Sequence, residues 1–186
     1  MYNNKNKQQN LRVLVTGATG FIGSRIVKRL LADGEYNVRC MTRNPDSIFD
    51  LFNLSGDIIE VAKTDASNYL ELVEALKGVD VAFYLIHSME GSSKKWKEFS
   101  KRDRIAAENF AKAASQTNTK RIIYLSGLID AEHKDLSEHM QSRKEVGDIL
   151  RTSKAEVTIF RAAVILGQGG GSFQMLQYLV ERLPIM

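Results

Sequence analysis

The sequence predicts an α/β protein: a doubly wound parallel sheet, the Rossmann fold, with about six strands and helices on both faces. From Leu11 onward, short runs rich in β-branched residues alternate with longer segments of helical period, the pattern of parallel strands joined by crossover helices. The first such run ends directly in a glycine-rich turn that opens an amphipathic helix. With 186 residues, 44% of them hydrophobic, the chain can bury one sizeable core, so we expect a single domain.

The expected strands are residues 12–16, 37–42, 58–62, the middle of 79–86, 121–126 and 156–161. Helical patterns lie between them at residues 21–31, 69–76, 95–114 and 137–150. Right-handed crossovers place helices on both faces, and ligands of such sheets bind beyond the carboxyl ends of the strands. Functional residues are therefore expected just after strands.

The chain divides into three expected parts. Residues 1–10 form a flexible polar tail, residues 11–167 form the sheet domain, and residues 168–186 form a glycine-rich joint followed by a helix. In the last part, Ser172 is expected to cap a helix over residues 173–182, which Pro184 would end.

Composition excludes several classes of protein. Cys40 is the only cysteine, so an intramolecular disulfide or a multi-cysteine zinc site is impossible, and we predict no metal site. A net charge of +4 does not favour nucleic-acid binding, and Trp96 and Phe99 fit a packed apolar stripe better than base stacking. The polar start lacks the apolar core of a secretory signal, and no apolar run could span a bilayer. We expect a cytoplasmic protein without a membrane or nucleic-acid partner.

Glycines 17, 20 and 23 come directly after the first expected strand, in the spacing G-x-x-G-x-x-G. Glycine permits a tight turn, lets backbone N–H groups approach a pyrophosphate and brings the helix against the strand. The helix N-terminus favours the phosphate charge. Other strand-to-helix turns use glycine too, but three glycines at this spacing favour dinucleotide binding.

The turn reads Thr-Gly-Ala-Thr-Gly-Phe-Ile-Gly over residues 16–23, and with residues 62–66, 121–127 and 160–167 it resembles the short-chain dehydrogenase/reductase superfamily. The resemblance covers nearly the whole chain and is strongest to the atypical and extended branches, the sugar-nucleotide-epimerase-like and NmrA-like proteins. It implies an NAD(P) cofactor. The residues of the turn implied to bind it are Gly17, Thr19, Gly20, Phe21, Ile22 and Gly23.

The choice of dinucleotide depends on the end of the second expected strand. An NAD-specific site usually has an acid about 20 residues beyond the glycines, and Arg43 stands there. Because a guanidinium suits a 2′-phosphate, we predict NADP, with NAD still possible. Asp65 occupies the position of the family's adenine contact, with Ala66 beside it. The same aspartate is also explained as a helix N-cap.

The superfamily's catalytic Tyr-x-x-x-Lys pair is missing. The aligned helix places His139 and Arg143 in the tyrosine and lysine positions, on one helical face. Histidine titrates near neutral pH and can exchange a proton there, while Arg143 would supply a fixed charge. The alternative is that both are ordinary polar residues left after loss of catalysis. Ser126 is the nearest hydroxyl to the family's catalytic serine or threonine.

His87 and Ser88 end the fourth expected strand and should border the cofactor, although His87 also fits a satisfied core histidine. Because the family shapes its substrate pocket beyond the sixth strand, residues 168–186 are interpreted as the start of an incomplete substrate-binding region. Two functions follow: an NADP(H)-dependent oxidoreductase or epimerase-like enzyme for a small carbonyl or alcohol, or a non-catalytic redox sensor, regulator or assembly factor. Family members often pair through the helices at 95–114 and 137–150, so a homodimer or a protein partner is possible.

Overall fold

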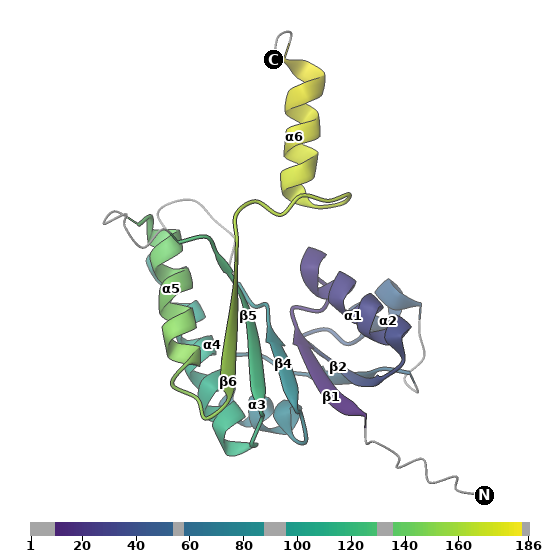
Figure 1. Cartoon of the computed structure of the whole chain (residues 1–186), viewed down its shortest axis with the longest axis vertical. Coiled ribbons are helices and arrows are strands. Elements are labelled where there is room, and N and C mark those ends of the chain that lie inside the picture. The colour runs from purple at the N-terminus through teal and green to yellow at the C-terminus, as the bar shows by residue number, and fades with distance from the viewer. Residues whose placement is uncertain (1–9, 54–57, 88–95, 130–135, 184–186) are drawn as a thin grey trace, which may run out of the picture.

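The computed structural model describes residues 10–53, 58–87, 96–129 and 136–183. They form one six-stranded, all-parallel sheet in the order β3-β2-β1-β4-β5-β6 (Figure 1). The strands are β1 (Leu11–Thr16), β2 (Tyr36–Thr42), β3 (Glu60–Lys63), β4 (Val81–Tyr84), β5 (Arg121–Gly127) and β6 (Glu156–Ala162). Strand order reverses between β1 and β4, which is where ligands of such sheets bind.

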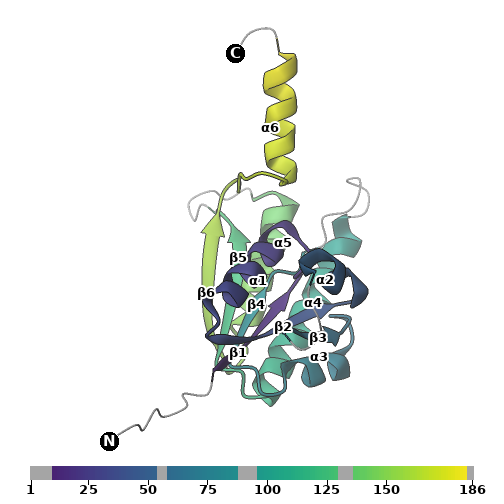
Figure 2. The same ribbon diagram turned by 90° about the vertical axis from the view of Figure 1, so that its right-hand side faces the viewer.

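Helices cover both faces of the sheet, as Figures 1 and 2 show. The helices are α1 (Phe21–Asp33), α2 (Asp46–Phe52), α3 (Tyr69–Leu76), α4 (Trp96–Gln116), α5 (Glu138–Leu150) and α6 (Gly171–Arg182). α1 and α2 pack on one face, and α3, α4 and α5 on the other. The predicted doubly wound Rossmann fold is therefore confirmed.

β1 explains why the sheet is buried on both sides. Val13 and Val15 pack in the core under α1 and α2, whereas Leu14 between them packs in the core under α3, α4 and α5. All three are 2% exposed or less. A strand buried on both faces reads as a continuous apolar run, which is how β1 appears in the sequence.

Some predicted boundaries were wrong. α2 was not predicted, because its seven residues after Pro45 are too few to show a helical period. The third strand begins at Glu60 instead of residue 58, whereas the fourth, Val81–Tyr84, is the predicted middle of residues 79–86. Ser172 does not cap α6: the helix begins at Gly171, and Gly170 is its N-cap. Pro184 lies outside the described residues.

α6 stands apart from the sheet. It projects beyond the carboxyl ends of the strands in both views (Figures 1 and 2), and none of its residues is buried. Across the described ranges, no helix combines the length and apolar character that a membrane span requires.

Candidate functional site

The side chain of Thr16 links the end of β1 to the end of β4 through two hydrogen bonds. Its buried hydroxyl donates to the carbonyl oxygen of Phe83 at 3.0 Å and accepts from the backbone N–H of Leu85 at 2.8 Å. The next residue, Gly17, adopts φ +61°, and a β-carbon there would lie 3.2 Å from the carbonyl oxygen of Leu85. The glycine turn therefore lies against the segment that carries His87.

The turn brings α1 close to β1. A β-carbon on Gly23 would lie 2.2 Å from the carbonyl oxygen of Gly17, a distance that no side chain can occupy. Gly20 donates its N–H to the same carbonyl at 2.9 Å, which closes the turn. These contacts are the tight turn and close helix approach expected of a dinucleotide-binding motif.

The N-terminus of α1 is suited to a phosphate. Gly20 is its N-cap, no side chain caps the helix, and no acidic residue stands in its first turn. The first N–H groups of the helix and its dipole therefore favour an anion. Of the turn residues expected to bind the cofactor, Thr19 and Gly20 are exposed, and Phe21 and Ile22 are half-buried.

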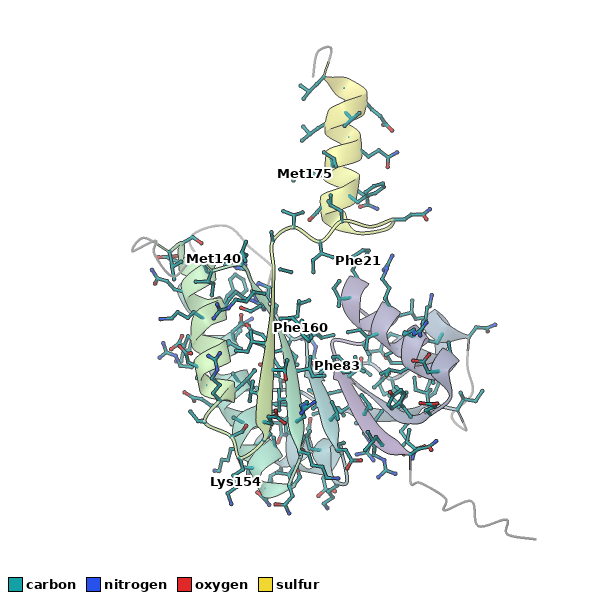
Figure 3. All side chains as sticks on the ribbon, in the orientation of Figure 1. Phe21, Phe83, Met140, Lys154, Phe160 and Met175 are labelled. Carbon is teal, nitrogen blue, oxygen red and sulfur yellow. The ribbon has the colours of Figure 1, made fainter. Side chains whose placement is uncertain are left out.

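The chain after β6 returns to this turn. Arg25 stacks on the Phe21 ring at 3.8 Å, and its guanidinium donates to the carbonyl oxygen of Gln168 at 2.6 Å. β-carbons on Gly167 or Gly170 would come within 3.0 Å of the same ring, so the glycines let this segment cross Phe21. Phe21 lies below α6 at the carboxyl edge of the sheet (Figure 3).

Arg43 and Asp65 lie after neighbouring strands, β2 and β3, and both are exposed. The Asp65 carboxylate accepts from the backbone N–H and the hydroxyl of Ser67, and these bonds, with the nearby charge of Arg43, lower its pKa. Asp65 is not the N-cap of α3, so that alternative was wrong: Asn68 caps this helix. Ala66 is partly buried against the core beside them.

A buried polar cluster lies past the ends of β4 and β5. His87, just after β4, has its Nδ1 3.1 Å from Oδ2 of Asp103 on α4, and the Asp103 side chain is 6% exposed. The ring of His139 on α5 lies 4.8 Å from that of His87, centroid to centroid. The fold therefore brings together two of the predicted site residues, His139 and His87.

Arg143 contacts the strand instead of open space. Its guanidinium donates to the carbonyl oxygen of Leu125 and lies 4.9 Å from the centroid of the Tyr124 ring. The Tyr124 hydroxyl donates to the backbone carbonyl of Arg143 at 3.0 Å and is also bonded to the Ser126 side chain. Ser126 is 5% exposed, so it sits inside the cluster.

The surroundings set the protonation of the cluster. Burial, followed by the charges of His87 and Arg143, lowers the pKa of His139, while Asp103 opposes this change. Burial raises the pKa values of Tyr84 and Tyr124, so both phenols stay neutral. His139 is thus neutral at physiological pH and able to accept a proton.

One predicted site residue is not described by the structure, and one residue of the site was not predicted from the sequence. Ser88, expected at the cofactor, lies outside the described residues. Asp103 was not singled out from the sequence, although it carries a signal: it continues the spacing of Ala107, Phe110 and Ala114, which are fully buried. A carboxylate on the buried stripe of a helix needs a polar partner, and His87 is one such partner of Asp103. The described residues contain no cluster that could hold a metal ion.

The chain belongs to the NAD(P)H-binding family, whose sequence profile matches residues 17–179. The predicted placement among atypical, NmrA-like members of the short-chain dehydrogenase/reductase superfamily is confirmed. Membership of this family indicates that the cofactor is a nicotinamide dinucleotide. The glycine turn and the uncapped N-terminus of α1 fit its pyrophosphate.

Two curated relatives match the chain in part. Cinnamoyl-CoA reductase 1 of Petunia hybrida is 34% identical over 120 residues, which covers 62% of this chain and 35% of that protein. The auxiliary protein GraX of Staphylococcus aureus is 31% identical over 120 residues, which covers 62% of this chain and 36% of that protein. Each match spans about a third of the relative's length.

Among solved structures, the Bordetella bronchiseptica enzyme WbmG in complex with NAD has the same fold. The TM-score is 0.78 at 16% identity, and the alignment covers 95% of this chain and 61% of that one. At this identity the likeness concerns the fold alone.

Proposed function

We propose that this chain is the cofactor-binding part of an NADP(H)-dependent oxidoreductase or sugar-nucleotide-epimerase-like enzyme that acts on a small carbonyl or alcohol. The observation that carries the proposal is that the glycine turn and the two histidines lie in one region of the fold, joined through the segment after β4. Gly17 abuts Leu85, and His87, two residues later, is in ring contact with His139. A cofactor on the turn would bring its reactive end toward a side chain that can exchange protons.

In this proposal each residue has a defined task. The turn from Gly17 to Gly23 holds the pyrophosphate, Asp65 and Ala66 border the adenine, and Arg43 faces the ribose 2′-position. A bound nicotinamide supplies or accepts the hydride at the substrate carbon. His139 handles the proton on the substrate oxygen. Ser126 is bonded to the Tyr124 hydroxyl, which in turn donates to the backbone carbonyl of Arg143, so Ser126 helps to hold the strand against α5.

We assign NADP preference to Arg43. The end of β2 carries an exposed guanidinium where an NAD-specific site has a carboxylate, and the charge of Arg43 reaches Asp65 across the strand ends. A guanidinium pairs with a 2′-phosphate through two parallel hydrogen bonds. NAD would bind without this pairing, and therefore more weakly.

The test is a titration with NADPH and NADH, followed by fluorescence and thermal shift. Arg43→Glu should weaken NADPH binding about tenfold to a hundredfold, because a charge-assisted hydrogen bond to the 2′-phosphate is lost. NADH binding should stay nearly unchanged. Lys154→Glu is the charge-matched control, because Lys154 is exposed at the opposite end of the sheet (Figure 3). Equal affinity of the wild type for both nucleotides would refute the preference for NADP. Absence of binding by either would refute the proposal as a whole.

A second candidate is a non-catalytic NADP(H)-binding redox sensor, regulator or assembly factor. It is favoured by Arg143, whose guanidinium is bonded to the carbonyl of Leu125 and stacked on Tyr124 instead of standing in the family's ribose-binding role. The matched Staphylococcus aureus relative is described as an auxiliary protein. Turnover that is unchanged by His139→Ala would remove His139 from the mechanism. NADPH binding without turnover of any carbonyl or alcohol would favour the sensor.

Two further assignments belong to the proposal. A homodimer through α4 and α5 stays a prediction: over the described parts of these helices, Ile105 is the one large apolar side chain that is exposed, at 37%. The described parts of α4 and α5 therefore lack the apolar face that would support such a dimer.

We also place the protein in the cytoplasm, because Cys40 is a buried free thiol and suits a reducing compartment.

A further inference from the structure

Asp103 is a buried carboxylate that lies against the ring of His87. Its side chain is 6% exposed, that of His87 is 15% exposed, and the two meet at 3.1 Å between Oδ2 and Nδ1. A buried carboxylate is costly unless it accepts hydrogen bonds or pairs with a cation. The pair joins α4 to the end of β4 and stands beside the glycine turn.

The chemistry of the two groups fixes the tautomer of His87. An ionised carboxylate only accepts hydrogen bonds, so the Nδ1 of His87 must carry the proton in this contact. In neutral His87 the other nitrogen, Nε2, is then an acceptor. This atom is buried and has no hydrogen-bond partner among the described residues. A base whose second nitrogen is held by a carboxylate is the usual arrangement of an oriented acid/base histidine.

His139 lies next to this oriented ring. The centroids of the two rings are 4.8 Å apart, with an interplanar angle of 59°. The other groups that face them are Arg143 from α5, and Tyr84 and Tyr124 from the sheet. Since both phenols stay neutral, Asp103 supplies a negative charge and Arg143 a fixed positive charge among the described groups around His139.

We propose that Asp103, His87 and His139 form one proton-transfer unit, in which Asp103 holds His87 in its Nδ1–H form so that Nε2 can take up the proton that His139 receives from substrate. The inference rests on the proposed function for the source of that proton. Asp103 and His87 are positioning residues, and His139 is the group that meets the substrate. His87, charged at the end of the transfer, would be stabilised by the Asp103 carboxylate.

The step balances for the oxidation of an alcohol. The substrate C–H bond breaks and its hydride passes to the oxidised nicotinamide. The O–H bond breaks, its proton goes to one nitrogen of His139, and the C=O bond forms. The other nitrogen of His139 then releases its proton to Nε2 of His87, which ends as an imidazolium beside the Asp103 carboxylate. The two rings are in contact but not hydrogen-bonded in this structure, so this transfer requires a rotation of the His139 ring or one bridging water. Reduction of a carbonyl is the reverse sequence.

The test uses ¹⁵N NMR of the histidine side chains in the full chain without cofactor, between pH 5 and 9. The sequence has three histidines, so three single variants assign the signals. In the wild type, neutral His87 should be in the Nδ1–H form. Asp103→Asn should shift His87 toward the Nε2–H form and move the titration midpoint of His139 downward, because the opposing negative charge is lost.

His87→Gln should move the His139 midpoint in the opposite direction, upward, since the interaction with His87 lowers the pKa of His139. The matched control is Asp148→Asn, which removes one exposed carboxylate from the same helix as His139 and should move neither signal. A thermal melt of each variant confirms that the fold is intact. If Asp103→Asn unfolds the chain, the wild-type tautomer and His87→Gln still decide the question.

Either of two results would overturn the inference: an Nε2–H tautomer for neutral His87 in the wild type, or a His139 midpoint that His87→Gln leaves unchanged. Because these readouts need no cofactor, their failure is distinct from failure of the proposed function, which appears in the nucleotide titration. The predicted tautomer and the paired opposite shifts together would support the unit even before a substrate is known.

Discussion

At the scale of single residues, the glycine turn places its strictest demand on Gly23. A β-carbon there would meet the carbonyl oxygen of Gly17 at 2.2 Å, and backbone cannot yield as the end of a flexible side chain can. Gly23→Ala should therefore push α1 away from β1, lower the free energy of unfolding by about 1–3 kcal/mol and weaken NADPH binding. Denaturant unfolding and nucleotide titration measure both effects.

The control for this substitution is Gly171→Ala, because a β-carbon at Gly171 meets nothing within 4 Å. This change should leave stability and nucleotide binding as they are, within about 0.5 kcal/mol. If Gly23→Ala proved as harmless as its control, the close approach of α1 to the turn would not be what holds this motif in shape.

At the scale of elements, Asp80 ties three strands together at their amino ends. Its carboxylate accepts from Nζ of Lys120 at 2.7 Å and from the backbone N–H of Arg12 at 3.0 Å, and these two bonds lower its pKa. Asp80→Asn should cost about 1 kcal/mol of unfolding free energy at pH 7, because an uncharged amide makes weaker bonds. Urea unfolding measures this difference.

The lowered pKa of Asp80 determines how the stability difference between the wild type and Asp80→Asn changes with pH. A carboxyl whose folded pKa is depressed stabilises the fold fully above its unfolded pKa, about 3.9, and loses that contribution as the pH falls through the folded pKa. The gap between wild type and Asp80→Asn should therefore narrow from pH 7 to pH 3. An equal gap at both pH values would show that the ionised carboxylate is not the source of the stability.

The elements also show how far local sequence signals reach. β1 and α3 were predicted nearly to the residue, because an apolar run that ends in glycines and an amphipathic segment of helical period are local signals. α2 was missed because seven residues after Pro45 give too little period, and the start of α6 was misplaced because Gly170 caps it with its backbone alone.

Within the site, local patterns located the residues but not their contacts. The turn glycines and His139 were found by spacing and by resemblance to the family. The contact between His139 and His87 follows only once the fold brings the first turn of α5 to the segment after β4. Asp103 was not predicted, because His87, which it contacts, lies 16 residues earlier in the chain, in the segment after β4. Likewise, the bond from Arg143 to the carbonyl of Leu125 depends on the packing of α5 on β5.

At the scale of the whole molecule, the sheet domain and α6 differ in what holds them. The domain has two buried cores, whereas α6 has no buried residue and keeps Leu176 and Leu179 44% and 42% exposed. Burial of apolar surface supplies most of the stability of a fold. The free energy of unfolding of this chain should therefore come from the sheet domain, and α6 should contribute little to it.

The double variant Leu176→Gln, Leu179→Gln tests this division. It should leave the melting temperature of the chain unchanged, since neither side chain packs in a core and glutamine keeps the helix propensity of leucine. The matched comparison is Leu72→Ala on α3, where a fully buried leucine is truncated and about 2–5 kcal/mol should be lost. Thermal melts followed by circular dichroism report both variants. A fall in melting temperature from the α6 variant comparable to that from Leu72→Ala would mean that α6 packs on the domain in solution, and that the domain does not end where its buried core ends.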